Sequence, residues 1–269
     1  MTNVLDPIPT WVIMLVSALL IFAMSEAGFR LGERRGKVPE GKDPSWLLEA
    51  SAYTMLALLL GFSFSMALGR YDARRGTFLR EANAIATAFL RAQLLDLKTR
   101  STIQTDLRAY VGERLDFARA DAAPQQRATA DDNSAKLQRD MWSLAMRAAA
   151  RDVHSTMVPL FVASLNDVIN LSTEERAVLT NHIPDVVIVW LLLIALIASI
   201  MMGYGFGREG RRALVVKGVF AVMVSLVFGL VLDLDRPQRG IIRVNLSSMQ
   251  RMQRMQQSIE NATATSPAP

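Results

Sequence analysis

The stretch LALLLGFSFSMALGRYDARRGTFLREANAIATAFLRAQLL, from Leu56 to Leu95, determines how the rest of the chain is interpreted. Its first part, up to Gly69, is almost wholly apolar, whereas charged residues crowd the segment from Arg70 to Arg75. No proline or turn signal interrupts the stretch. We therefore predict one long helix that leaves the lipid bilayer and becomes the first helix of a polar extramembrane domain.

Small residues recur on one face of the apolar part. Gly61, Ser65 and Gly69 are spaced four apart, so that within a bilayer a second helix can approach them closely. Two interpretations fit this pattern: ordinary packing between helices, or packing of neighbouring subunits around a pore. In the second interpretation, bulkier residues of the same helix form a constriction that gates by excluding water. The pore and constriction candidates are Leu58, Gly61, Phe62, Ser65 and Met66.

Composition excludes several classes of protein. Of the 269 residues, 51% are hydrophobic and 20% charged, and the mean hydropathy is +0.22, which indicates a membrane protein with a polar portion. There is no cysteine, and the two histidines lack metal-ligand spacing. No nucleophile paired with a base and no phosphate-binding loop is visible, so we expect neither an enzyme nor a cofactor or metal. The net charge of +5 comes mainly from arginines near membrane ends, which favours anionic lipid over nucleic acid as a partner.

Four apolar runs are long enough to cross a bilayer. The first extends from Ile8 to Ser25 and is followed, not preceded, by positive charge, which is typical of a transmembrane helix and not of a cleaved signal peptide. The second span ends at Gly69. The chain is thereby divided into 1–69 with two membrane helices, a helical extramembrane domain at 70–182, two further membrane helices in 183–235 (spans 186–206 and 213–232), and a C-terminal amphipathic segment with a disordered tail at 236–269.

Polar residues and glycines mark the ends of these spans. Glu26 and Arg30 lie four apart, and we expect them to pair at the interface, the alternative being that Glu26 belongs to an ion path. Lys217, near the beginning of the fourth span, is expected to extend toward the lipid headgroups. The alternating glycines of 203–207 are interpreted as a flexible end of the third span.

The polar stretch 70–182 shows helical spacing and no strand alternation. We predict capping boxes at Ser101 with Gln104 and at Ser172 with Glu175, each beginning a helix, and a loop at 120–133. The apolar face that continues the long helix consists of Phe78, Ala82, Ile85 and Phe89. The predicted fold class is all-α: four transmembrane helices with a helical domain inserted between the second and the third, the second span continuing into that domain.

Charged residues at the ends of the second and fourth spans are the main functional candidates. Because both spans exit on the same side, opposite charges can form an ion-pair collar that holds the two helix ends together. The alternative is a vestibule that concentrates ions at a pore mouth. The candidates are Arg70, Asp72, Arg74, Arg75, Glu81, Asp233, Asp235 and Arg236.

Two motifs resemble the bacterial membrane-protein family of unknown function that is labelled bestrophin-like. The first joins LLGFSFS at 59–65, RYDARR at 70–75 and EANAI at 81–85, and the second is LDLDRP at 232–237 followed by Gly240. The four spans, the helical domain and the order of the motifs match as well. The family is distantly similar to bestrophins, which are oligomeric ion channels. Their pattern usually continues with a tryptophan pair, where this chain has the residues at 73–75 instead.

Two functions follow from these observations. One is an oligomeric, bestrophin-like ion channel or pore whose second transmembrane helix lines the path for small ions. The other is a non-conducting scaffold or sensor whose helical domain binds a protein partner. We expect a homo-oligomer in the bilayer of a bacterial inner membrane. The arginine-rich loops 30–44 and 207–212 favour a helical domain outside the cytoplasm, whereas the bestrophin resemblance implies a cytoplasmic one.

Overall fold

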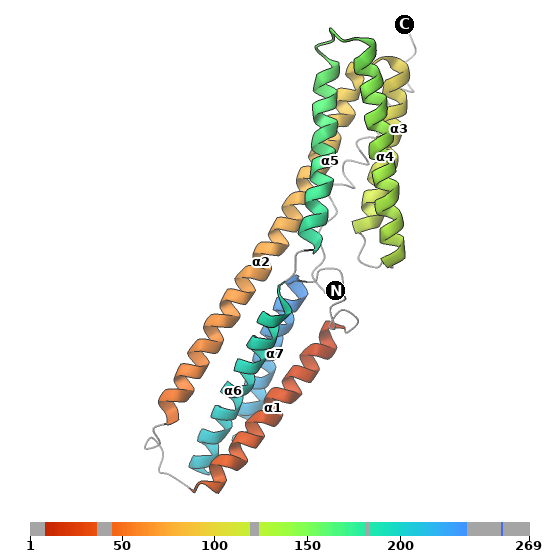
Figure 1. Ribbon diagram of the computed structural model, residues 1–269. Helices are drawn as coiled ribbons and strands as arrows, with labels where there is room; N and C mark the ends of the chain where they lie inside the picture. Colours follow the sequence, from red (N-terminus) through yellow and green to blue (C-terminus); the bar gives the residue numbers. More distant parts are fainter. Residues whose placement is uncertain (1–8, 37–44, 119–123, 181–182, 236–253, 255–269) are drawn as a thin grey trace. The chain divides into compact units, whose positions relative to one another are not determined.

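The computed structural model describes residues 9–36, 45–118, 124–180, 183–235 and 254, and the regular elements of these residues are all helices (Figure 1). Four of the helices are long and apolar enough to cross a membrane, which confirms the predicted all-α class with four spans. The elements are α1 (Thr10–Arg34), α2 (Ser45–Arg91), the short 3₁₀ helix η1 (Ala92–Leu94), α3 (Leu97–Ala118), α4 (Pro124–Arg151), α5 (Val158–Thr180), α6 (Asp185–Glu209) and α7 (Leu214–Asp235).

The chain divides into two compact units. The membrane unit comprises the described residues up to Tyr71 and those of 183–235, and the helical domain comprises those of 72–180. Helix α2 contributes to both, since its 47 residues form one uninterrupted helix of about 70 Å at the usual rise per residue. The apolar stretch up to Gly69 and the charged and apolar residues that follow it thus belong to one helix. The C-terminal segment 236–269, predicted to be amphipathic and then disordered, lies outside the described residues apart from Arg254.

Glycines bring α1 and α6 into close contact in the membrane unit. A Cβ atom at Gly28 would overlap the backbone of Ile200, and one at Gly203 would overlap the backbone of Ser25. Gly32 and Gly207 are equally tight, each against backbone atoms of the facing helix. This is small-residue packing at four-residue spacing on both helices. The glycines of 203–207 are therefore a packing surface, and their interpretation as a flexible helix end was wrong.

One face of α2 packs in the membrane unit. Leu56 is buried in a cluster with Ile21, Ala198 and Val224, which belong to α1, α6 and α7. The ring of Tyr53 lies 5.8 Å from that of Phe220 on α7.

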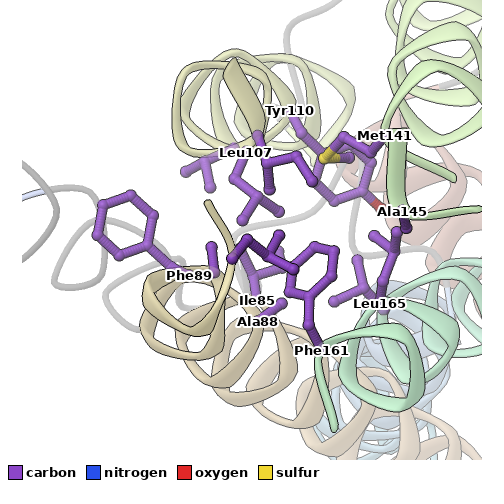
Figure 2. Packing of buried hydrophobic residues seen from close by; sticks show 14 of the residues in the cluster. Ile85, Ala88, Phe89, Leu107, Tyr110, Met141, Ala145, Phe161 and Leu165 are labelled. Atoms are coloured by element: carbon purple, nitrogen blue, oxygen red, sulfur yellow. The ribbon is translucent and has the colours of Figure 1, made fainter. Parts of the chain in front are cut away.

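The core of the helical domain is formed by α2, α3, α4 and α5, each contributing apolar residues at helical spacing. Figure 2 shows these side chains gathered between the four helices, among them Ile85, Leu107, Met141 and Leu165. The predicted apolar face of the long helix is buried throughout, with exposures of 5% or less. This part of the pattern was sufficient because the four predicted positions are apolar and recur at helical spacing.

The helix boundaries in this domain differ from the predicted ones. Helix α3 begins at Leu97, where the carboxylate of Asp96 accepts from the Thr99 backbone N–H at 3.1 Å, so Ser101 lies inside the helix and caps nothing. Ser172 likewise lies inside α5, and its hydroxyl donates to the carbonyl of Ile169. Helix α4 begins at Pro124 within the predicted loop, because proline fits the first position of a helix, where no backbone N–H is needed.

Candidate functional sites

One side of the membrane part of α2, which we call its unpartnered half, packs against no other helix among the described residues of the membrane unit. Leu58, Phe62 and Met66 are exposed, Phe62 by 62% of its surface. A Cβ atom at Gly61 or at Gly69 would meet nothing within 4 Å. Ser65 is exposed on the same half of the helix. All the predicted pore and constriction residues therefore lie on the surface of the single subunit.

This surface suits a bilayer or a neighbouring subunit. It is apolar apart from small hydroxyls, and its glycines offer the closest approach to another helix. The opposite face of α2 carries the buried residues Leu56, Ser63 and Ala67. One side of the helix therefore packs inside the membrane unit, and the other side is open to lipid or to another subunit. Packing around a pore stays a prediction at this stage.

The charged residues that follow the membrane part of α2 and those at the end of α7 differ strongly in exposure. Asp235, Asp233 and Arg74 are exposed by 6% of their surface or less, whereas Asp72 and Arg75 are exposed. The carboxylate of Asp235 accepts from the buried backbone N–H of Ile183, at 3.0 and 3.2 Å from its two oxygens. Sequence reasoning missed this contact, since no local pattern relates residues that lie so far apart in the chain. Of the remaining candidates, Arg70 is partly buried, with Nη2 3.8 Å from the sulfur of Met66, and Arg236 lies outside the described residues. The pairing of these charges in a collar stays a prediction.

Two carboxylates share one guanidinium inside the helical domain. Arg114 on α3 donates to Glu81 on α2, with Nε 2.8 Å from Oε1 and Nη2 3.3 Å from Oε2. The same guanidinium forms an ion pair with Glu175 on α5. The three side chains are exposed by 1% or less. We call Glu81, Arg114 and Glu175 the buried triad.

Neutral groups extend the buried triad to the fourth helix. The hydroxyl of Tyr110 donates to Glu81 at 2.9 Å, and the amide of Gln138 on α4 donates to Tyr110 and to Ser172 at 3.0 and 2.8 Å. Burial, together with the negative charge of Glu81, raises the pKa of Tyr110 above its usual range, so this phenol remains a donor at neutral pH. The network therefore connects all four helices of the domain.

The position of Glu81 differs from the predicted one. A vestibule needs exposed charges, whereas Glu81 is fully buried between helices. Glu175 is also buried and also differs from its prediction, because it lies inside α5 and does not cap a helix. A signal for both was present, because Glu81 shares the helical phase of Phe78 and Ile85, and a charge in an apolar stripe predicts a buried partner.

A second cluster of charges surrounds Glu26 in the membrane unit. Lys217 on α7 is fully buried, with Nζ 2.7 Å from Oε2 of Glu26 and 4.6 Å from the centre of the Phe29 ring. Arg212 lies 3.1 Å from the other carboxylate oxygen. The predicted pair of Glu26 with Arg30 is present at 3.9 Å, as the longest of the three contacts. Lys217 was expected to extend toward the headgroups, which is wrong because Glu26 and Phe29 hold it between the helices.

The described residues contain no group of three or more His, Cys, Asp or Glu side chains that could hold a metal ion. The charges that they do place together are ion pairs between carboxylates and Arg or Lys.

Comparison with known proteins places this geometry in a family. A family model described as a Bestrophin-like domain matches residues 50–249. The fold is similar to the crystal structure of a bacterial bestrophin homologue from Klebsiella pneumoniae, with a TM-score of 0.68 and 13% identity over 93% of this chain and 97% of that one. A substituted form of that homologue has a TM-score of 0.69 and 13% identity over 92% and 99%. A crystal structure described as a membrane protein has a TM-score of 0.68 and 15% identity over 95% and 99%. A comparison with curated proteins gives no match.

Proposed function

Because the chain belongs to the bestrophin-like family, we propose that it forms an oligomeric ion pore with the membrane part of α2 lining the path. The proposal places this multi-pass membrane protein in the inner membrane of a bacterium, where several copies assemble with equivalent α2 helices around a common axis. It rests on one observation above all, which is the unpartnered half of α2.

The unpartnered half of α2 carries both small and large side chains, and this combination suits a ring of helices around a pore. Small residues at Gly61, Ser65 and Gly69 allow the α2 helix of a neighbouring subunit to approach. The larger Leu58 and Phe62 then project beyond the helix backbone and narrow the path. A ring of such apolar side chains gates by excluding water from the constriction.

Arginines follow the constriction along the same helix. Arg70 lies about 12 Å further along the helix axis than Phe62, at the usual rise per residue. A ring of subunits multiplies this charge and favours anions at the mouth, while the exposed Asp72 acts against the preference. The proposal therefore names small ions as the cargo and leaves their sign to measurement.

Planar-bilayer recording of the purified protein tests this function. Phe62→Ala should raise the single-channel conductance above that of the parent, because it removes the largest side chain from the constriction. Met223→Ala is the matched control, since Met223 on α7 is also exposed by 62% but lies on another helix. A silent parent protein, or equal currents in the parent and in Phe62→Ala, would contradict the pore.

The alternative is a non-conducting scaffold or sensor, and one observation in the helical domain favours it. Leu97, the first residue of α3, and Val153, in the turn between α4 and α5, are exposed by 77% and 79%. Exposed apolar side chains that form a contiguous patch are typical of surfaces that bind another protein, and these two residues are the candidates for such a patch. An assembled protein that carries no current in the bilayer recording would favour this function over the pore.

A further inference from the structure

A groove along the second half of α1 combines apolar walls with exposed arginines. It has a volume of about 540 Å³ and is lined by Phe22, Ala23, Glu26, Ala27, Arg30, Leu31 and Arg34. Phe22, Ala23 and Ala27 come before the two arginines along the helix, whereas Leu31 lies between Arg30 and Arg34 near the C-terminal end of α1. The groove thus has an apolar stretch that continues into a cationic end.

The charges at this end are not balanced. Among the described residues that line the groove, Glu26 is the only acidic one. Three cations lie within 4 Å of its carboxylate, at 2.7 Å (Lys217), 3.1 Å (Arg212) and 3.9 Å (Arg30). Arg34 adds a further positive charge to the lining. Because one carboxylate cannot neutralise these cations, the groove attracts a negative ligand.

We propose that this groove is a binding site for one anionic phospholipid. An acyl chain lies against Phe22, Ala23 and Ala27, while the phosphate is held by Arg30 and Arg34. Basic pockets beside transmembrane helices bind anionic headgroups in this manner. A free anion would use only the cationic end and leave the apolar stretch empty, so the shape of the groove favours a lipid. The ion pair of the buried Lys217 with Glu26 fixes the base of the site, because it joins α7 to α1.

The site is independent of conduction, since none of its residues belongs to the unpartnered half of α2. It also differs from general attraction of a basic protein to an acidic membrane. Arg34 lines the groove whereas the neighbouring Arg35, equally exposed, does not. These two residues provide a matched pair for an experiment.

The experiment measures binding of phosphatidylglycerol to the purified full-length protein in detergent, by native mass spectrometry and by the thermal unfolding midpoint. Phosphatidylcholine and inorganic phosphate serve as the two reference probes. The parent should retain phosphatidylglycerol in preference to phosphatidylcholine, and inorganic phosphate should leave the midpoint unchanged. Arg34→Gln should weaken phosphatidylglycerol binding about fivefold, the loss expected for one cation at a lipid headgroup, while Arg35→Gln should not change it.

A second pair of variants tests the apolar part of the groove without changing charge. Ala27→Trp fills the groove and should abolish the preference for phosphatidylglycerol, whereas Leu19→Trp, at an exposed position of α1 outside the groove, should keep it. Equal losses in Arg34→Gln and Arg35→Gln would overturn the site in favour of unspecific surface charge. Stabilisation by inorganic phosphate equal to that by the lipid would assign the cationic end to a free anion. A change of oligomeric state in Ala27→Trp alone would make the groove a contact between subunits, which also overturns the proposal.

Discussion

The guanidinium of Arg114 pairs with two carboxylates, and all three charged groups are buried inside the helical domain. Taking charges out of water costs several kcal/mol each, and only close pairing with further hydrogen bonds offsets this cost. Tyr110 supplies one of these bonds to Glu81. The buried triad therefore ties α2, α3 and α5 together only as long as all of its members are present.

Arg114→Met should lower the free energy of unfolding by about 3–5 kcal/mol, because it leaves two buried carboxylates without their cation. Unfolding in mixed micelles, followed by circular dichroism, measures this. The matched control is Arg80→Met, which removes an ion pair with Glu174 whose two side chains are about half exposed and which should cost at most about 1 kcal/mol. Additional Glu81→Gln and Glu175→Gln changes should recover much of the loss. Equal costs in the two single variants would contradict the role of the buried triad.

Asp235 has two possible contributions, and one pair of variants separates them. Asp235→Ala leaves the buried N–H of Ile183 without an acceptor and should cost about 1–3 kcal/mol. Asp235→Asn keeps an acceptor oxygen but removes the charge, so it should retain most of the stability if the backbone contact is the main contribution. A loss in Asp235→Asn as large as that in Asp235→Ala would instead support the ion-pair collar with the arginines of α2. Full stability of Asp235→Ala in detergent would rule out both contributions.

The packing of α1 on α6 shows that a pattern of small residues predicts close helix packing but does not identify the helices that meet. Gly28 and Gly32 on α1, with Gly203 and Gly207 on α6, follow the spacing that allows two membrane helices to approach closely. The spacing is visible in the sequence, but it does not state which helices meet. The similar series at Gly61 and Gly69 on α2 meets nothing within the subunit. A small-residue pattern therefore predicts close packing without naming the partner.

Gly203→Ala should destabilise the membrane unit, because the new methyl group would overlap the backbone of Ser25 and force the two helices apart. Overpacking of this kind typically costs about 1–3 kcal/mol. Gly218→Ala is the control, since a Cβ atom there meets nothing within 4 Å, and alanine should stabilise that helix by about 0.4–1 kcal/mol. The thermal midpoints of the two variants in the same detergent should move in opposite directions. A parent-like midpoint for Gly203→Ala would contradict the close contact.

At the scale of the whole molecule, the sequence predicted those features that depend on apolar residues close together in the chain. Runs of apolar residues located the four spans, and the periodicity of Phe78, Ile85 and Phe89 located the face of α2 that enters the core of the helical domain. Polar residues were assigned less well, since Glu81 and Lys217 were expected at a surface and both are fully buried. Their partners, Arg114 and Glu26, lie on other helices, and only the tertiary fold brings such charges together.

The distribution of arginines favours one orientation of the protein in the membrane. Arg30 and Arg34 lie in the last turns of α1, and Arg212 lies in the short connection between α6 and α7. Positive charge in and beside short connections normally stays in the cytoplasm. Arg70 and Arg75, on the segment of α2 that leaves the membrane, oppose this assignment, as does the bestrophin resemblance. Because the connection around 35–44 is short, whereas long domains cross membranes largely regardless of their charge, we expect the helical domain outside the cytoplasm.

Single cysteines in this cysteine-free chain test both the topology and the orientation. Arg35→Cys lies just after α1 and Gln125→Cys lies in α4, with one membrane span between them, so a membrane-impermeant thiol reagent should reach them from opposite sides. In spheroplasts of the expressing bacterium, the cysteine at 125 should label at once and the cysteine at 35 only after lysis. The reverse order would place the helical domain in the cytoplasm and leave the four-span topology intact. Labelling of both cysteines from the same side would contradict the topology itself. Such a result requires an even number of membrane crossings between positions 35 and 125, whereas the four-span topology has one.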